Sequence, residues 1–263
     1  MGFSYSKVEC FHNCPYCYKL RYIDKLEPKP DMSPNNALFC GTAVHEGIEK
    51  RSVDAAVESY KSHYPELTNA HEIEILKLKT IVPTAIKEIP EGEYEKCLRD
   101  KDGFIGYIDC LVPVEEGVYD LLDFKHSNNV GGYKNSAQVH LYKYYYEKIT
   151  GNKIRDLYYV FIPKYKDVLT EDMSVEDEDK LKQNIIETLS KKDIIFEKVE
   201  YNRQQVNWFF ARKALMDKAM EFPKRYSVTC NWCDYQKYCS SNGKDTSELV
   251  VNEPEQKEVS LFA

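Results

Sequence analysis

The sequence predicts an α/β protein, and three observations lead to this prediction. Apolar residues have helical spacing early in the chain, form short alternating runs between residues 94 and 126, and return to helical spacing afterwards. Apolar residues make up 43% and charged residues 30% of the 263 residues, as in ordinary globular proteins. Glycine-containing turns separate the alternating runs. We therefore expect core elements in the order helix, three antiparallel strands, helix, strand.

The individual elements follow from these local patterns. Helical spacing predicts five helices, over 41–64, 67–89, 134–149, 174–191 and 203–222. Three β-like runs predict an antiparallel meander, with strands over 94–99, 104–114 and 118–125. The turns of this meander are expected at 100–103 and 115–117. A further strand over 154–162 ends at Pro163, which has no N–H to continue a strand ladder.

Charge and hydropathy exclude several classes of protein. The formal net charge is −7, which argues against a protein that binds nucleic acid non-specifically through bulk positive charge. No segment approaches the roughly 20 apolar residues that span a bilayer, and the polar N-terminal segment does not resemble a signal peptide. We therefore expect a cytoplasmic protein with no membrane partner. One domain is expected over residues 1–240, followed by a flexible acidic tail over 241–263.

Nine cysteines require an explanation, because an odd number in a reducing compartment does not favour a disulfide framework. Six of them lie in two clusters, Cys10, Cys14 and Cys17 near the N-terminus and Cys230, Cys233 and Cys239 near the C-terminus. Such clustering favours metal ligation. The other three lie singly in apolar contexts and are expected to be small buried side chains, namely Cys40, Cys97 and Cys110.

Two acidic residues on neighbouring expected strands predict a site for phosphodiester hydrolysis. Side chains alternate across a strand, so Asp123 and Lys125 share a face, while Leu122 and Phe124 share the other. Asp109 lies in an apolar run, where a buried carboxylate is costly unless it is paired or binds a cation. Two converging carboxylates suit a hard ion such as Mg²⁺ or Mn²⁺. A lysine beside them can orient the nucleophile and offset charge on the phosphate.

These residues resemble the motifs of the PD-(D/E)XK nuclease superfamily. The resemblance rests on Gly106-x-x-Asp109 followed by Asp123-Phe124-Lys125 at the end of a strand. It implies a restriction-endonuclease-like fold, in which helices flank a central mixed sheet. It also implies that Asp109, Asp123 and Lys125 are catalytic and that both acids bind the metal ion.

Two further motifs are similar to those of RecB-type nucleases. The segment from Gly41 to Glu46 resembles a G-x-x-x-H helix start, which implies that His45 joins Asp109 and Asp123 on the metal. The segment from Gln138 to Tyr142 resembles the Q-x-x-x-Y helix that follows the catalytic strand. Residues four apart share one face of a helix, so Gln138 and Tyr142 would contact the catalytic lysine and a DNA phosphate.

The clustered cysteines add a second resemblance. Cys230-x2-Cys233-x5-Cys239, together with the distant Cys14-Pro15, is similar to the iron–sulfur staple of AddB-type and CRISPR-associated RecB-like nucleases. This implies a 4Fe–4S cluster that joins the two ends of the chain, held by Cys14, Cys230, Cys233 and Cys239. Cys10 and Cys17 compete with Cys14 for the N-terminal position, and Zn²⁺ at the four cysteines is an alternative.

The combined resemblance implies a Mg²⁺- or Mn²⁺-dependent deoxyribonuclease. An exonuclease is expected, acting on single-stranded DNA or duplex ends in DNA repair, recombination, CRISPR adaptation or phage DNA processing. The sequence has no G-x-x-x-x-G-K-S/T motif, so a helicase partner would supply any unwinding. Two alternatives remain open. One is a non-catalytic DNA-binding module with the nuclease fold, and the other is a zinc-stapled interaction protein.

The C-terminal residues from Glu258 to Phe262 resemble a bacterial sliding-clamp-binding peptide. Such a peptide presents a leucine and a phenylalanine to a preformed apolar pocket, here Leu261 and Phe262. A sliding clamp is therefore an expected partner. The alternative is that these two side chains fold back on the domain or have no role.

Overall fold

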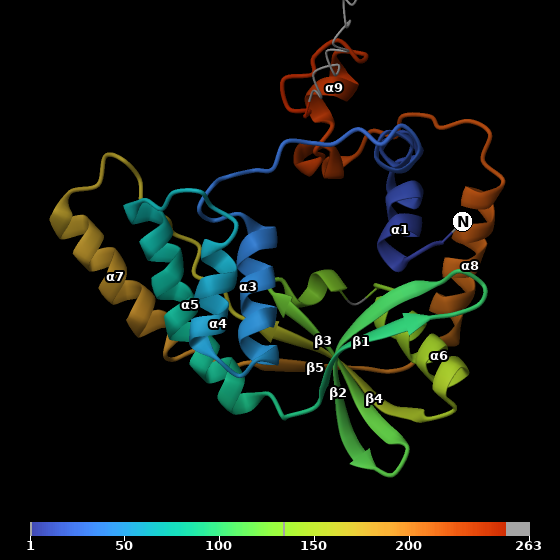
Figure 1. Ribbon diagram of the computed structural model, residues 1–263, viewed down its shortest axis with the longest axis horizontal. Helices are drawn as coiled ribbons and strands as arrows, with labels where there is room; N and C mark the ends of the chain where they lie inside the picture. The colour runs from blue at the N-terminus through green and yellow to red at the C-terminus, as the bar shows by residue number, and fades with distance from the viewer. Residues whose placement is uncertain (1, 134, 251–263) are drawn as a thin grey trace, which may run out of the picture. The chain divides into compact units, whose positions relative to one another are not determined.

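The computed structural model describes residues 2–133 and 135–250 (Figure 1). Within the residues expected to form one domain, two compact units are distinguishable. Of the described residues, the first unit contains residues 2–5 and those between 32 and 211, and the second contains residues 6–31 and 212–250. None of the described helices is both long and apolar enough to cross a bilayer.

The first unit is built on a five-stranded mixed sheet (Figure 1). Its strands follow chain order across the sheet, β1 (Glu93–Arg99), β2 (Ile105–Glu115), β3 (Val118–His126), β4 (Lys153–Ile162) and β5 (Ile195–Val199). β3 and β4 are parallel, because α6 (Gln138–Thr150) carries the chain back between them, and the other neighbours are antiparallel. The expected α/β restriction-endonuclease-like fold, with a central mixed sheet, is confirmed.

The structure differs from the expected strands at one edge. β5 was not expected, because apolar and polar residues do not alternate along Ile195–Val199. Ile195 and Phe196 are both exposed, as befits a short edge strand. α6 begins at Gln138 rather than at 134, after a 3₁₀ turn over Val130–Tyr133. α8 (Arg203–Asp217) ends before the expected residue 222.

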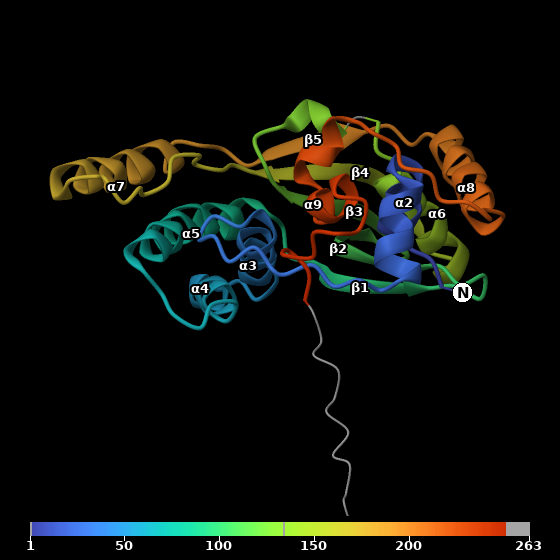
Figure 2. The same cartoon turned by 90° about the horizontal axis from the view of Figure 1, so that it is seen from above.

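Four helices form a layer beside the sheet, α3 (Ala37–Glu49), α4 (Val53–Lys61), α5 (Asn69–Glu88) and α7 (Val175–Leu189) (Figure 2). The single helix expected over 41–64 is wrong, because the chain turns between α3 and α4. Arg51 has a left-handed φ of 49° there, and Ser52 caps α4 by accepting a hydrogen bond from the Ala55 N–H. A side chain added at Gly47 would lie 2.7 Å from the Ala56 Cβ, so this glycine permits the close packing of the two helices.

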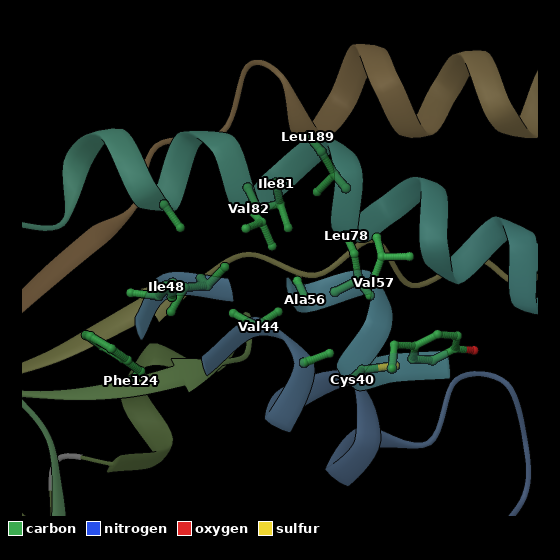
Figure 3. Close-up of a cluster of buried hydrophobic side chains, with 14 of the residues drawn as sticks. Cys40, Val44, Ile48, Ala56, Val57, Leu78, Ile81, Val82, Phe124 and Leu189 are labelled. Carbon is green, nitrogen blue, oxygen red and sulfur yellow. The ribbon is translucent and has the colours of Figure 1, made fainter. Parts of the chain in front are cut away.

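The main hydrophobic core lies between these helices and the sheet (Figure 3). Val44 and Ile48 of α3 and Leu78 and Val82 of α5 point into it, together with Phe124 of β3. All five side chains are at most 3% exposed. Burial of each such side chain contributes about 1.5–3 kcal/mol, which makes this layer the principal anchor of α3.

A second group of contacts attaches α6 to the sheet through aromatic residues. The rings of Tyr145 and Phe104 stack with centroids 3.7 Å apart. Gly151 ends α6 with a left-handed φ of 77°, a conformation that glycine adopts without a steric penalty.

β3 contributes alternate residues to two layers, since Phe124 belongs to the core with α3 and Lys125 contacts α6.

The second unit consists of short helical segments from both ends of the chain. These are α1 (Tyr5–Asn13, from its second residue), α2 (Pro15–Tyr18), a π-helical turn (Lys19–Ile23), the final residues of α8, a 3₁₀ turn (Val228–Trp232) and α9 (Gln236–Ser240). Leu20, Tyr235 and Leu249 form a small apolar cluster. The Val250 N–H donates to the Glu27 carbonyl at 2.8 Å.

Residues 241–250 were predicted to belong to a flexible tail, but they contact the second unit. Leu249 is only 4% exposed, and it anchors this segment in the apolar cluster. The expected clamp-binding peptide, Glu258 to Phe262, lies outside the described residues.

Candidate active site

The two acidic residues predicted from sequence lie next to each other in the first unit. Cys110 of β2 pairs with Leu122 of β3, and the next residues along these antiparallel strands are Asp109 and Asp123. The Phe124 N–H donates a 2.6 Å hydrogen bond to Oδ2 of Asp109. This bond fixes the Asp109 carboxylate against β3 and leaves its second oxygen available to a ligand.

Burial makes both carboxylates costly to ionise. It raises the pKa of Asp109 and the pKa of Asp123 to about 6, and the positive charge of Lys125 opposes this rise in both. The charge of Asp109 raises the pKa of Asp123 further. Asp123 is only 1% exposed. A bound cation would stabilise the charged form of both groups, so the donors present fit a divalent metal ion.

Lys125 connects the acids to α6 through side-chain contacts. Its Nζ forms an ion pair with Asp123 Oδ2 and donates to Gln138 Oε1 at 3.3 Å. Gln138 Nε2 in turn donates to the Tyr142 hydroxyl at 3.2 Å. Burial disfavours the charged form of Lys125, but Asp123 and Asp109 outweigh this effect and raise its pKa. The structure thus brings Asp109, Asp123, Lys125, Gln138 and Tyr142 close together, with Tyr142 linked to Lys125 through Gln138.

Two aromatic rings lie close to the Lys125 ammonium group. Its Nζ is 5.5 Å from the ring centroid of Tyr133 and 5.7 Å from that of Tyr159. Such contacts stabilise a cation by about 0.5–2 kcal/mol, depending on its exposure to water. The sequence analysis did not include either tyrosine, because Tyr133 and Tyr159 belong to a turn and a strand with no motif of their own.

His45 reaches the same site from α3. Its Nδ1 is 3.7 Å from Asp109 Oδ1, and its ring packs edge-on against Phe124 with centroids 5.5 Å apart. Burial lowers the pKa of His45, which favours the neutral imidazole that binds metals. Gly41 lies one helical turn earlier, and a Cβ placed there would have no atom within 4 Å. The face of α3 beside His45 is therefore sterically open at this glycine.

Glu95 of β1 is a member of the site that the sequence analysis missed. Ligand atoms of His45, Glu95 and Asp109 lie within 4.8 Å of one another. Glu95 has a left-handed φ of 48°, unusual for a residue other than glycine. In the sequence, Glu95 and Glu93 look like exposed charges of an edge strand, so no local signal distinguishes Glu95. Oxygen and imidazole donors together suit Mg²⁺ or Mn²⁺.

All six clustered cysteines line one cavity of about 570 Å³ within the second unit. They are the four expected ligands, Cys14, Cys230, Cys233 and Cys239, and the two competitors, Cys10 and Cys17. Cys17 Sγ is 3.9 Å from the Sγ atoms of both Cys10 and Cys233. Soft thiolate donors from both ends of the chain fit an iron–sulfur cluster or zinc.

The three single cysteines have different environments. Cys40 and Cys110 are buried, as expected. The expectation for Cys97 is wrong, since this residue is exposed on β1. The alternating burial of β1 places its side chain on the outer face, between the more buried Lys96 and Leu98.

Comparison with known proteins decides the family. The sequence profile of the PD-(D/E)XK nuclease superfamily matches residues 2–240. The chain belongs to this superfamily. Its fold is similar to the crystal structure of a "putative exonuclease" from Eubacterium rectale, with a TM-score of 0.55 and 15% sequence identity over 96% of this chain and 90% of that chain. No curated protein matches the chain.

The glycine that precedes Asp109 has a structural role in this PD-(D/E)XK site. A Cβ at Gly106 would lie 2.9 Å from the Phe104 ring and 3.0 Å from Cε1 of Tyr142. Any larger residue would push Tyr142 away from β2. Gly106 therefore allows the Tyr142 ring to pack closely against β2.

Proposed function

We propose that this nuclease is a divalent-metal-dependent deoxyribonuclease that trims DNA ends. The observation that carries the proposal is the buried pair of Asp109 and Asp123 beside the charged Lys125. Ionising both carboxylates in these surroundings is energetically unfavourable, so a purely structural role does not explain the pair.

Asp109, Asp123 and His45 would hold Mg²⁺ or Mn²⁺, and Glu95 would add a further oxygen donor. When bound, the ion supplies Lewis acidity and lowers the pKa of a coordinated water. The hydrogen bond from the Phe124 N–H fixes the Asp109 carboxylate, and the neutral imidazole of His45 would offer a nitrogen lone pair to the ion.

Lys125 would act on the scissile phosphate. Its ammonium group can donate to a phosphate oxygen and orient the attacking water, and it offsets the negative charge that develops in the transition state. Gln138 holds this ammonium group from one side and Asp123 from the other. Tyr142 fixes the amide of Gln138 through the 3.2 Å hydrogen bond. These contacts restrict Lys125 before substrate binds, which reduces the ordering required during the reaction.

The preference for DNA ends rests on the RecB-type motifs and on the fold shared with the Eubacterium rectale protein. A cytoplasmic exonuclease of this kind would act in DNA repair, recombination, CRISPR adaptation or phage DNA processing. A helicase would provide unwound substrate, and a sliding clamp would bind the segment from Glu258 to Phe262.

We further propose a 4Fe–4S cluster held by Cys14, Cys230, Cys233 and Cys239, with Zn²⁺ as the alternative. Two facts support it. The cysteines line one cavity, and segments from both ends of the chain form a single unit. Protein purified without air should be brown and contain iron, whereas a zinc protein would be colourless. Cys233→Ser should lower both the iron content and the thermal stability.

End-labelled DNA tests the nuclease proposal directly. Single-stranded and duplex substrates are incubated with anaerobically purified protein in Mg²⁺, Mn²⁺ or chelator. Cleavage should require the metal and disappear in Lys125→Ala, while the control Lys153→Ala, an exposed lysine at the start of β4, should cleave normally. The product ladder gives the direction of digestion. Metal-independent binding without cleavage would favour the non-catalytic DNA-binding module, and neither binding nor cleavage would favour the zinc-stapled interaction protein.

A further inference from the structure

The cavity of the second unit holds more thiols than one cluster needs. Six cysteines line it, and four are assigned above to the cluster. The remaining two, Cys10 and Cys17, are in direct contact, with their Sγ atoms 3.9 Å apart. Both are half-buried, and neither forms a disulfide.

This contact depends on an interruption of the helix at Cys14. On a continuous α-helix, residues seven apart are separated by about 10 Å along the axis, too far for two cysteine side chains to meet. Here α1 ends at Asn13, Cys14 has extended backbone angles (φ −153°, ψ 106°), and Pro15 begins α2. The chain therefore changes direction between Cys10 and Cys17 and brings the two sulfurs together.

We propose that Cys10 and Cys17 are an oxidisable dithiol, a modification site separate from the cluster ligands, that closes to a disulfide in the presence of a peroxide. The assignment of two thiols as spare rests on the cluster ligands proposed above. It does not depend on nuclease activity. The sulfurs must approach from 3.9 Å to about 2.05 Å, a movement that side-chain rotation and a small shift of the short helix α2 can provide.

The reaction with hydrogen peroxide is balanced in two steps. In the first, one sulfur attacks as the thiolate, an S–O bond forms as the O–O bond breaks, and the hydroxide released takes up the thiol proton to become water. In the second, the other sulfur attacks the sulfenic sulfur, the S–S bond forms, and the S–O bond breaks with loss of a second water. Two thiols are oxidised and one peroxide is reduced to two waters.

Closure would also change the surroundings of the cluster. Cys17 Sγ lies 3.9 Å from Cys233 Sγ, and Cys233 is one of the proposed ligands. In a disulfide with Cys10, the Cys17 sulfur would no longer be a free thiol beside Cys233. It could then not replace Cys233 as a ligand. The state of the dithiol is therefore coupled by direct contact to the environment of one cluster ligand.

The test uses the full-length protein purified without air, with its metal content measured first. Samples are treated with one equivalent of hydrogen peroxide, free thiols are alkylated under denaturing conditions, and peptides are mapped by mass spectrometry. We expect a linked peptide pair containing Cys10 and Cys17, and two fewer alkylated thiols. Cys97→Ser should behave like the wild type, since Cys97 is exposed and distant in sequence from both clusters.

Variants separate a dithiol from a ligand. Cys10→Ser and Cys17→Ser should lose the linked peptide while keeping wild-type iron content and visible absorbance, with Cys10→Ala and Cys17→Ala and their thermal melting as checks on folding. If Cys17→Ser lost iron as severely as Cys233→Ser while Cys14→Ser kept it, Cys17 would be a ligand and the proposal would be wrong. A metal-loaded wild-type protein that forms no Cys10–Cys17 link would overturn it equally. All these readouts are independent of DNA cleavage, so a failure of the nuclease proposal would be seen separately.

Discussion

The Asp109 carboxylate accepts a 2.6 Å hydrogen bond from the backbone N–H of Phe124. This contact ties β2 to β3 at the point where the two proposed metal-binding acids meet. It also means that Asp109 has two separable roles. One oxygen satisfies a backbone donor, and the other faces His45.

Substitutions of Asp109 should separate these roles. Asp109→Asn retains an oxygen that can accept from the Phe124 N–H, whereas Asp109→Ala leaves this donor without its partner. We expect both variants to lose metal-dependent cleavage, and Asp109→Ala to be less stable than Asp109→Asn by about 1–3 kcal/mol. Urea denaturation in the presence of chelator measures the difference. Equal stability of the two variants would show that the hydrogen bond does not support the fold.

Stability should depend on pH in a way that reports the buried acids. Their pKa is about 6 in the folded protein and near 3.8 when unperturbed, so the folded state binds more protons than the unfolded state between these values. Metal-free protein should therefore be most stabilised by these groups below pH 4, and this contribution should be lost as the pH rises through 6. The loss should be roughly 3 kcal/mol for each of the two carboxylates.

Thermal melting in chelator from pH 4 to 8 measures this trend. Asp123→Asn should flatten the curve, and Glu116→Gln, at an exposed turn between β2 and β3, should leave it unchanged. Mn²⁺ should restore stability at pH 8, where the carboxylates are ionised. Cleavage should fall as the pH drops below about 6, because protons then compete with the metal. A curve unchanged in Asp123→Asn would contradict the assignment of the buried acids.

Glu95→Gln should weaken metal binding while preserving the fold. The substitution keeps the shape of the side chain and removes a negative charge within 4.8 Å of the donor atoms of His45 and Asp109. We expect the Kd for Mn²⁺ to rise about tenfold, equivalent to about 1.4 kcal/mol, in isothermal titration calorimetry. Glu93→Gln is the matched control, since Glu93 lies on the same strand and pairs with Lys96. A Kd equal to that of the control would exclude Glu95 from the metal site.

Local patterns in the sequence were sufficient to predict four of the five strands and the proximity of most of the proposed site residues. Alternation around Asp123 and Lys125 depends only on strand geometry, and the contact of Gln138 with Tyr142 depends only on helical spacing. Features that depend on tertiary packing escaped prediction. Glu95 joins the site through the register of β1 with β2 and through its left-handed backbone, neither of which its neighbours in sequence indicate.

The difference between local pattern and tertiary packing also explains why the single helix expected over 41–64 is two helices, α3 and α4. Apolar spacing continues across residues 50–52, but the chain turns there so that α4 can pack against Gly47 of α3. The Cys10–Cys17 contact also depends on a bend, at Cys14, that a count of residues along an ideal helix does not reveal.

Two glycines of the site should respond in opposite ways to alanine. Gly41→Ala adds a methyl group where no atom lies within 4 Å, so it should stabilise α3 by about 0.5–1 kcal/mol, as expected for this replacement inside a helix. Gly106→Ala places a methyl group about 3 Å from the Phe104 and Tyr142 rings, and it should destabilise the protein by about 1–3 kcal/mol.

Cleavage assays on variants of these two glycines then distinguish the access of substrate to the acids from the positioning of Lys125. Gly106→Ala should slow cleavage, because displacing Tyr142 loosens Gln138 and hence Lys125. Gly41→Trp should fold normally yet also slow cleavage, because its side chain would fill the open space on the face of α3 beside His45. If Gly41→Trp folded and cleaved DNA at the wild-type rate, the substrate would have to reach the acids by a path that does not pass this face of α3.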